Sequence, residues 1–129
     1  MASLNLPRKP VIVAICVSVA ALHLVTGPRY NGPLRPFVTG YLIDLLLPFS
    51  LVLLLWLGLA RVPVLRSPVS RACLVFCIGA VVELSQYLDV PVFGRTFDPL
   101  DLLMYAIGAA AAVGFEKLAF SPIPERTGA

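Results

Sequence analysis

Seven polar residues lie in or beside the apolar stretches of this chain, and their types are those that transfer protons or bind ligands. Carboxyl groups with a histidine can do acid–base chemistry, because burial brings the pKa of a carboxyl toward neutrality. Carboxylate oxygens can also hold a divalent cation. Ionisable groups are costly inside a bilayer, so a set of them usually marks a site. The seven are His23, Asp44, Glu83, Gln86, Arg95, Asp98 and Asp101.

The sequence contains no catalytic motif that would select one of these reactions. The chain has no HExxH, GxSxG, P-loop or GxGxxG pattern. The question of an enzyme therefore stays open, with Glu83 and Asp101 as the candidate acid–base groups. We predict no metal centre and no cofactor. The cysteines all fall inside apolar stretches and are interpreted as small packing residues. They are Cys16, Cys73 and Cys77.

The composition places these residues in a membrane protein. The chain has 129 residues, of which 59% are hydrophobic and 13% charged, and its mean hydropathy is +0.92. Soluble domains carry about 25% charged residues. The length allows one domain, residues 1–129, and no separate soluble module.

Four apolar stretches are near the length that a membrane-spanning helix needs, about 20 residues. They cover about residues 10–26, 37–59, 68–88 and 99–120. The first is short and follows Arg8 and Lys9, as the core of a signal peptide would. No small-x-small cleavage site follows it, so we interpret it as an uncleaved helix. The sequence thus predicts an all-α fold, a four-helix transmembrane bundle.

Local signals refine the helix ends and contacts. Ser67-Pro68 and Asp98-Pro99 are typical helix starts, and Asp101 could return a capping hydrogen bond to residue 98. Pro48 predicts a kink in the second helix. Gly108 and Ala112 form a small-xxx-small pair for close helix packing, within the chain or between two copies.

The basic residues predict the topology. With four spans, the N-terminus, the second loop and the C-terminal tail share one side. That side holds Arg8, Lys9, Arg61, Arg66, Arg71, Lys117 and Arg126, against Arg29, Arg35 and Arg95 on the other. The positive-inside rule then places both termini in the cytoplasm, and the chain in the cell inner (cytoplasmic) membrane as a multi-pass protein. No nucleic-acid module signature is present, so the net charge of +3 indicates no nucleic-acid partner.

This topology places the seven polar residues in the extracytoplasmic third of the bundle. Glu83 and Gln86 share a helix face with Gly79, and Asp101 shares a face with Tyr105 and Gly108. If both faces point inward, Glu83 approaches Asp101, with Arg95 as the countercharge. Structural roles compete with this reading. Asp98 is well suited to a helix cap, and His23 could bond a neighbouring helix or lie at the interface.

Three segments in the second half of the chain resemble the VanZ-like family. They are Val82-Glu83-Leu84-Ser85-Gln86-Tyr87, Gly94-Arg95-Thr96-Phe97-Asp98-Pro99-Leu100-Asp101 and Tyr105-Ala106-Ile107-Gly108. Tyr105 stands where many relatives have Asn, and this is more similar to the related DUF2809 branch, as is the acidic Asp44. The resemblance implies a small bacterial multi-helix membrane protein with Glu83, Gln86, Arg95 and Asp101 as its shared residues. The family's namesake is linked to low-level resistance to the glycopeptide teicoplanin.

Three functions are compatible with this pattern. The first, which we favour, is binding of a lipid or cell-envelope precursor head group in the polar pocket. The second is an enzyme acting on a lipid-linked substrate. The third is a structural subunit of a larger membrane complex. The expected partners are membrane lipids, with anionic or polyprenyl-linked ones as candidates, and either another membrane protein or a second copy of the chain.

Overall fold

The computed structural model, which describes residues 3–59, 61–90 and 96–121, contains helices and no strands in those ranges. Four helices are long and apolar enough to cross a membrane, which confirms the all-α transmembrane prediction. The chain is therefore a multi-pass membrane protein. In order, the elements are α1 (Arg8–Val25), α2 (Arg35–Gly40), α3 (Leu42–Leu59), η1 (Pro63–Arg66), α4 (Pro68–Tyr87) and α5 (Pro99–Ala119).

The predicted second helix is divided into two. A turn at Tyr41 separates α2 from α3, directly after Gly40, a residue with low helix propensity. Asp44 consequently lies in the first turn of α3 and not one to two turns inside a longer helix. A carboxylate in a first turn is favoured by the helix dipole. The deep position predicted for Asp44 was wrong for this reason.

Both predicted helix starts are confirmed. Ser67 caps α4 by accepting a hydrogen bond from the Ser70 N–H, and Asp98 caps α5 by accepting one from the Leu100 N–H. The expected return bond from Asp101 is absent from the described contacts. The N–H of Asp98 instead points to Glu83 Oε2 at 3.4 Å. Glu83 of α4 thus accepts the Asp98 N–H, which Asp101 would accept in a capping box.

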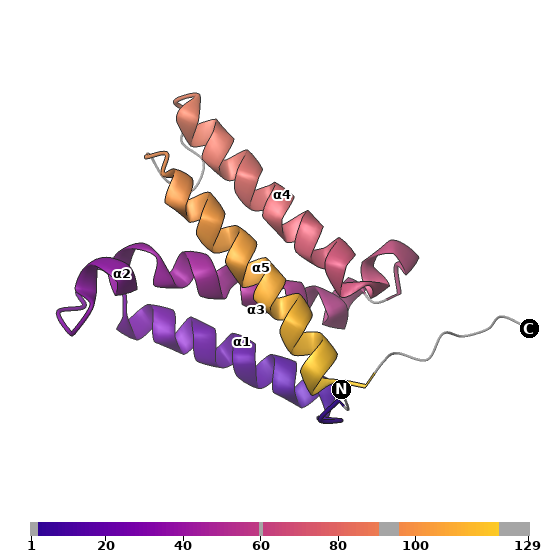
Figure 1. Ribbon diagram of the computed structural model, residues 1–129. Coiled ribbons are helices and arrows are strands. Elements are labelled where there is room, and N and C mark those ends of the chain that lie inside the picture. The colour runs from indigo at the N-terminus through magenta and orange to yellow at the C-terminus, as the bar shows by residue number, and fades with distance from the viewer. Residues whose placement is uncertain (1–2, 60, 91–95, 122–129) are drawn as a thin grey trace, which may run out of the picture.

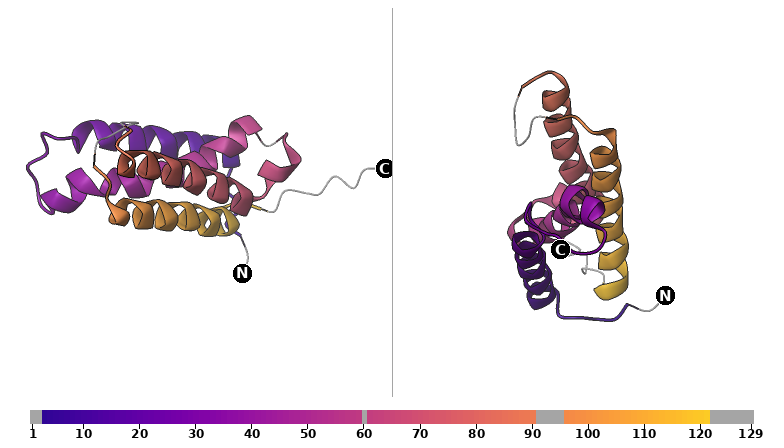
Figure 2. Two further views of the ribbon diagram at one scale, coloured as in Figure 1. Left: turned by 90° about the horizontal axis from the view of Figure 1, so that it is seen from above. Right: turned by 90° about the vertical axis from the view of Figure 1, so that its left-hand side faces the viewer.

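The long helices are arranged around α3. Helix α3 packs against α1, α4 and α5, whereas the backbone of α1 packs against neither α4 nor α5. Figure 1 shows α1 and α3 running side by side, and α5 crossing α3 beside α4. Figure 2 shows the same arrangement from above and from one end. The backbone packing that joins α1 to the other long helices therefore runs through α3.

The buried core is small, and most of the outer surface is apolar. Val52 and Leu53 of α3 and Ala112 of α5 are fully buried. Large hydrophobic side chains such as Val81 and Leu84 are exposed on the outside. In a soluble protein such a surface would drive association, but in a bilayer it faces lipid. This distribution agrees with four membrane spans.

Helices α3 and α5 approach each other closely where Gly108 of α5 meets α3. A Cβ at position 108 would lie 2.1 Å from the backbone oxygen of Leu45 and 3.0 Å from Pro48 Cγ. Only glycine allows the two backbones to come this close. Helix α3 continues through the buried Pro48. The small-xxx-small pair therefore packs inside the chain, since Ala112 is fully buried as well.

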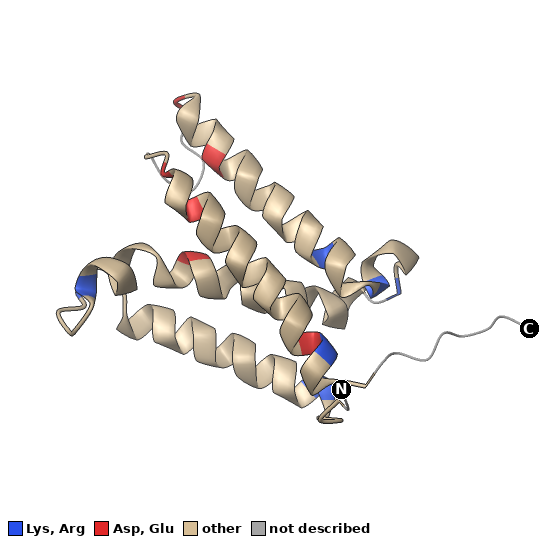
Figure 3. Cartoon of the chain, in the orientation of Figure 1, with Lys and Arg blue, Asp and Glu red and all other residues tan. Residues whose placement is uncertain are grey.

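The segment before α1 and the end of α5 meet at one end of the bundle. The Leu4 N–H donates to the Leu118 carbonyl and the Leu6 N–H donates to the Ala119 carbonyl, both at 2.9 Å. Figure 1 shows the start of α1 beside the end of α5. Figure 3 shows most basic residues near this terminal end and most acidic residues toward the opposite end, where α4 leads to α5. The charge of the bundle is thus strongly asymmetric along its length.

The glycine contact gives a matched pair of substitutions. We expect Gly108→Ala to destabilise the protein by about 1–3 kcal/mol, because the added methyl group has no room against a backbone oxygen. Gly114→Ala should be neutral or stabilising, since nothing lies within 4 Å of its Cβ position and alanine is the better helix former. Thermal unfolding in mild detergent measures both. Equal melting temperatures for the two variants would contradict the close contact.

Candidate functional site

Four carboxyl groups from α3, α4 and the start of α5 gather at the end of the bundle opposite the termini. Glu83 of α4 is the most enclosed, with 1% of its surface exposed. Its Oε1 accepts a hydrogen bond from the Tyr105 hydroxyl at 3.2 Å, and its Oε2 lies 3.4 Å from the Asp98 N–H. A buried carboxylate needs such donors, because losing its water shell is costly. Glu83 therefore links α4 to α5 at this end.

A glycine makes the contact between Glu83 and Tyr105 possible. A Cβ at Gly79 would lie 2.7 Å from Cδ2 of Tyr105, so the tyrosine ring packs directly on the backbone of α4. Gly79 precedes Glu83 by one helical turn. The ring lies across α4 there, and its hydroxyl reaches the carboxylate. The face predicted from the spacing of Gly79 and Glu83 is thus confirmed as an inward face.

Helix α3 brings a further carboxyl to the same place. Asp44 lies within hydrogen-bonding reach of both Tyr105 and Asp101. Asp44 and Asp101 are half-buried, in contrast to the enclosed Glu83. Glu83 and Asp101 lie at the same end of the bundle, near enough for their charges to act on each other. The Tyr105 hydroxyl donates to Glu83 Oε1, and the same side chain lies near Asp44.

Asp98 has both a structural and a site role. Its Oδ1 accepts the Leu100 N–H at 2.9 Å as the cap of α5, while its Oδ2 accepts the Tyr41 hydroxyl at 2.9 Å. This hydrogen bond is the main reason that the pKa of Tyr41 is raised above its ordinary value, with desolvation and the nearby carboxylates adding to it. The phenol consequently stays a donor. Tyr41, at the break before α3, was not expected from sequence.

The cluster offers acceptors and few free donors. The two tyrosine hydroxyls are already directed at Glu83 and Asp98. Within the described residues, no group of three or more histidine, cysteine or acidic residues has the geometry to hold a metal ion. Carboxyl groups that reach the surface can bind ammonium groups or sugar hydroxyls, or exchange protons. A ligand would therefore need to supply hydrogen-bond donors.

Of the remaining predicted site residues, His23 stands apart from these contacts. His23 is exposed on α1, in a shallow groove against α3 that is lined by Thr26, Leu42 and Ile43 among others. The backbone of α1 packs against neither α4 nor α5, which explains why His23 does not join the carboxyls. Gln86 is buried on α4, close to one turn after Glu83. Arg95 lies outside the described residues.

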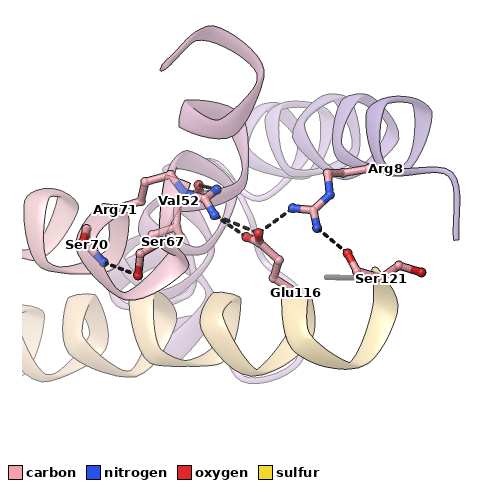
Figure 4. A network of polar contacts seen from close by, with 7 residues as sticks. All are labelled: Arg8, Val52, Ser67, Ser70, Arg71, Glu116 and Ser121. Atoms are coloured by element: carbon pink, nitrogen blue, oxygen red, sulfur yellow. Dashed lines mark hydrogen bonds and ion pairs between the residues drawn. The ribbon is translucent and has the colours of Figure 1, made fainter. Parts of the chain in front are cut away.

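A second polar network lies at the terminal end, and the sequence reasoning missed it. Arg71 of α4 is fully buried, and its Nη2 is 2.8 Å from both carboxylate oxygens of Glu116 on α5. Arg8 of α1 donates to the same carboxylate at 2.5 Å and to the Ser121 carbonyl at 3.1 Å. Figure 4 shows the two guanidinium groups approaching Glu116 from opposite sides. This network joins α1, α4 and α5.

The residues of this network were assigned other roles from sequence. Arg8 and Arg71 were interpreted as topology signals in solvent, and Glu116 was not considered. The helix phase of α5 contained the missing signal. Glu116 follows Ala112 by four residues, on the face that Gly108 begins. A carboxylate on a predicted packing face requires a buried cation, and Arg71 is the one in the facing helix.

Comparison with known proteins gave no relative for this chain: no family model matches it, and no curated protein or solved structure does.

The hydrogen bond from Tyr105 to Glu83 predicts the effect of removing one hydroxyl. We expect Tyr105→Phe to lower the free energy of unfolding by about 1–3 kcal/mol, because the buried carboxylate loses a donor. Tyr87→Phe is the matched control, since Tyr87 is 66% exposed on the same helix as Glu83. Thermal unfolding in detergent compares them. If Tyr105→Phe lowers the free energy of unfolding no more than Tyr87→Phe does, the hydrogen bond to Glu83 contributes nothing to stability.

The network at the terminal end predicts a larger effect. Glu116→Gln should destabilise the protein by about 3–5 kcal/mol, because two arginines would then share a buried site without a countercharge. Lys117→Gln, at the neighbouring exposed position, should cost under about 1 kcal/mol. The same unfolding assay measures both. If the two variants unfold at the same temperature, Glu116 does not hold the arginines.

Proposed function

We propose that the protein binds the head group of a lipid or of a lipid-linked cell-envelope precursor at the extracytoplasmic surface. The observation that carries this proposal is the gathering of carboxyls from three helices at one end of four membrane spans. Asp44, Asp98 and Asp101 are half-buried there, above the enclosed Glu83. Head groups lie at the depth of such helix ends, whereas the remaining surface contacts acyl chains.

The charge asymmetry supports the orientation. The described residues at the terminal end include Arg8, Lys9, Arg61, Arg66 and Lys117, and basic residues are retained in the cytoplasm. Both termini are then cytoplasmic, in the cell inner membrane. The carboxyl cluster faces the extracytoplasmic side, where lipid-linked precursors of the envelope are used.

The acceptor-rich cluster favours a ligand with several donors. An ammonium group or sugar hydroxyls would satisfy the carboxyl oxygens of Asp44 and Asp101. A phosphate in the same ligand could bind the basic residues expected on that side, Arg29, Arg35 and Arg95. An amine- or sugar-bearing phospholipid, or a polyprenyl-linked sugar, has both features.

Membership of the VanZ-like family belongs to the same proposal. What supports it is the position of the segments that carry the resemblance: Glu83 contacts the segment around Asp98, and Tyr105 and Gly108 lie on the face of α5 that meets α3 and α4. These contacts would explain why the family pattern spaces its residues in this order. A role in the cell envelope, related to glycopeptide resistance, follows from the family only.

Native mass spectrometry of the purified chain tests the proposed ligand site. We expect wild-type protein from mild detergent to carry a lipid-sized adduct, and Asp101→Asn to lower its occupancy by at least about tenfold, because a charge-assisted hydrogen bond is lost. Asp89→Asn is the matched control. Asp89 is exposed at the same end, and asparagine accepts its left-handed backbone, with φ of 59°.

Two results would contradict the proposal. One is wild-type protein free of adducts when it is extracted from its native membrane. The other is an adduct that both Asp101→Asn and Asp89→Asn weaken equally, which would indicate a general effect of charge at that end. Glu83→Gln provides a second variant at the cluster that retains hydrogen-bonding capacity.

A further inference from the structure

We propose that residues 3–8 form a releasable strap, which ties the start of α1 to the end of α5 and opens while the rest of the bundle stays folded. The strap consists of the segment before α1 together with Arg8, the first residue of that helix. It lies at the end of the bundle opposite the carboxyl cluster, so it does not depend on the ligand site proposed there.

The backbone of the strap supplies hydrogen-bond donors to the C-terminal end of α5. The last carbonyls of a helix have no partner within the helix. The Leu4 N–H donates to the Leu118 carbonyl and the Leu6 N–H donates to the Ala119 carbonyl, both at 2.9 Å. Asn5, between the two donors, has a left-handed backbone with φ of 52°, a conformation that asparagine tolerates. The strap therefore caps α5 through its main chain.

The side chain of Arg8 holds the strap by charge and by aromatic contact. Its guanidinium donates to the Glu116 carboxylate and, at 3.1 Å, to the Ser121 carbonyl (Figure 4). The same group lies 4.7 Å from the centre of the Trp56 ring and 4.8 Å from that of Phe120, within the range of cation–π attraction. These contacts fix the first residue of α1 against the end of α5.

The strap provides a connection that helix packing does not. The backbone of α1 packs against α3 and against neither α4 nor α5. Near its start α1 buries Ile12 fully, whereas Val17 and Leu24, farther along, are largely exposed. The strap thus acts at the end of α1 that lies closest to the core. With the strap open, α1 would remain on α3 and could change its tilt relative to α5.

Opening of the strap would leave no carboxylate unpaired inside the bundle. Glu116 would keep Arg71, whose Nη2 lies 2.8 Å from both of its oxygens. The Arg8 side chain is 13% exposed, against none for Arg71, so Arg8 is the guanidinium that can pass to water. Removing the only partner of a buried charge is what makes such a loss expensive. The two arginines therefore differ in permanence.

The strap also buries little apolar surface. Leu4 is 71% exposed, and Leu6 is exposed as well. Segments that depend on a few hydrogen bonds near the surface open at a lower free energy than the core does. The strap should consequently open far more often than α5 unfolds.

Hydrogen–deuterium exchange of the full-length protein in mild detergent, read by mass spectrometry, tests the strap. In the wild type we expect residues 3–7 to exchange more slowly than an unfolded peptide of the same sequence and faster than the middle of α5. Arg8→Gln should speed exchange of residues 3–7 by about tenfold, because a charge-assisted hydrogen bond is lost. Lys9→Gln, which removes the neighbouring exposed cation, is the matched control and should leave that exchange unchanged.

A second variant opens the strap without touching its charge. Asn5→Pro excludes a φ of 52°, because the proline ring holds φ near −65°. We expect residues 3–7 to lose their protection in this variant, while exchange in the middle of α4 and α5 stays at the wild-type rate.

Three results would overturn the proposal. Unprotected residues 3–7 in the wild type would show that the strap is not formed. Equal exchange of these residues in Arg8→Gln and Lys9→Gln would show that Arg8 does not hold it. Faster exchange throughout α4 and α5 in Asn5→Pro would show that the segment belongs to the cooperative core and does not open separately.

Discussion

The close contact between α3 and α5 sets the positions of both polar networks. Because Gly108 lets the α5 backbone approach Leu45, Asp44 at the start of α3 comes within reach of Asp101 and Tyr105. Toward the other end of the same contact, α5 places Glu116 beside the Arg71 that also donates to the Val52 carbonyl of α3. A single glycine thus aligns acidic groups at one end and an ion-pair network at the other.

The two networks differ in what they accomplish. At the terminal end the guanidinium groups surround one carboxylate, and the contacts tie α1 to α5 although the backbones of these helices do not pack against each other. At the opposite end, carboxyl groups and tyrosine hydroxyls meet, and Asp44, Asp98 and Asp101 are only half-buried. The network at the terminal end holds the helices together. The second leaves hydrogen-bonding capacity for a molecule outside it.

The sequence predicted the spans, the caps of α4 and α5, and the inward faces of Glu83 and Asp101, because these depend on local composition and helical spacing. It did not predict the break at Tyr41, which follows from Gly40 and moves Asp44 to a helix end. It also missed the pairing of Arg71 with Glu116, since residues 45 positions apart are brought together only by helix packing. His23 was grouped with the carboxyls because depth alone cannot show which helices touch.

The proposal that the carboxyl cluster is a ligand site can be tested most directly by cryo-electron microscopy of the protein in nanodiscs made from its native membrane. The account predicts head-group density against Asp44 and Asp101, at the end of the bundle opposite the termini. The proposal would be contradicted by a map in which only protein side chains contact these carboxyl groups and only acyl chains surround that end of the bundle.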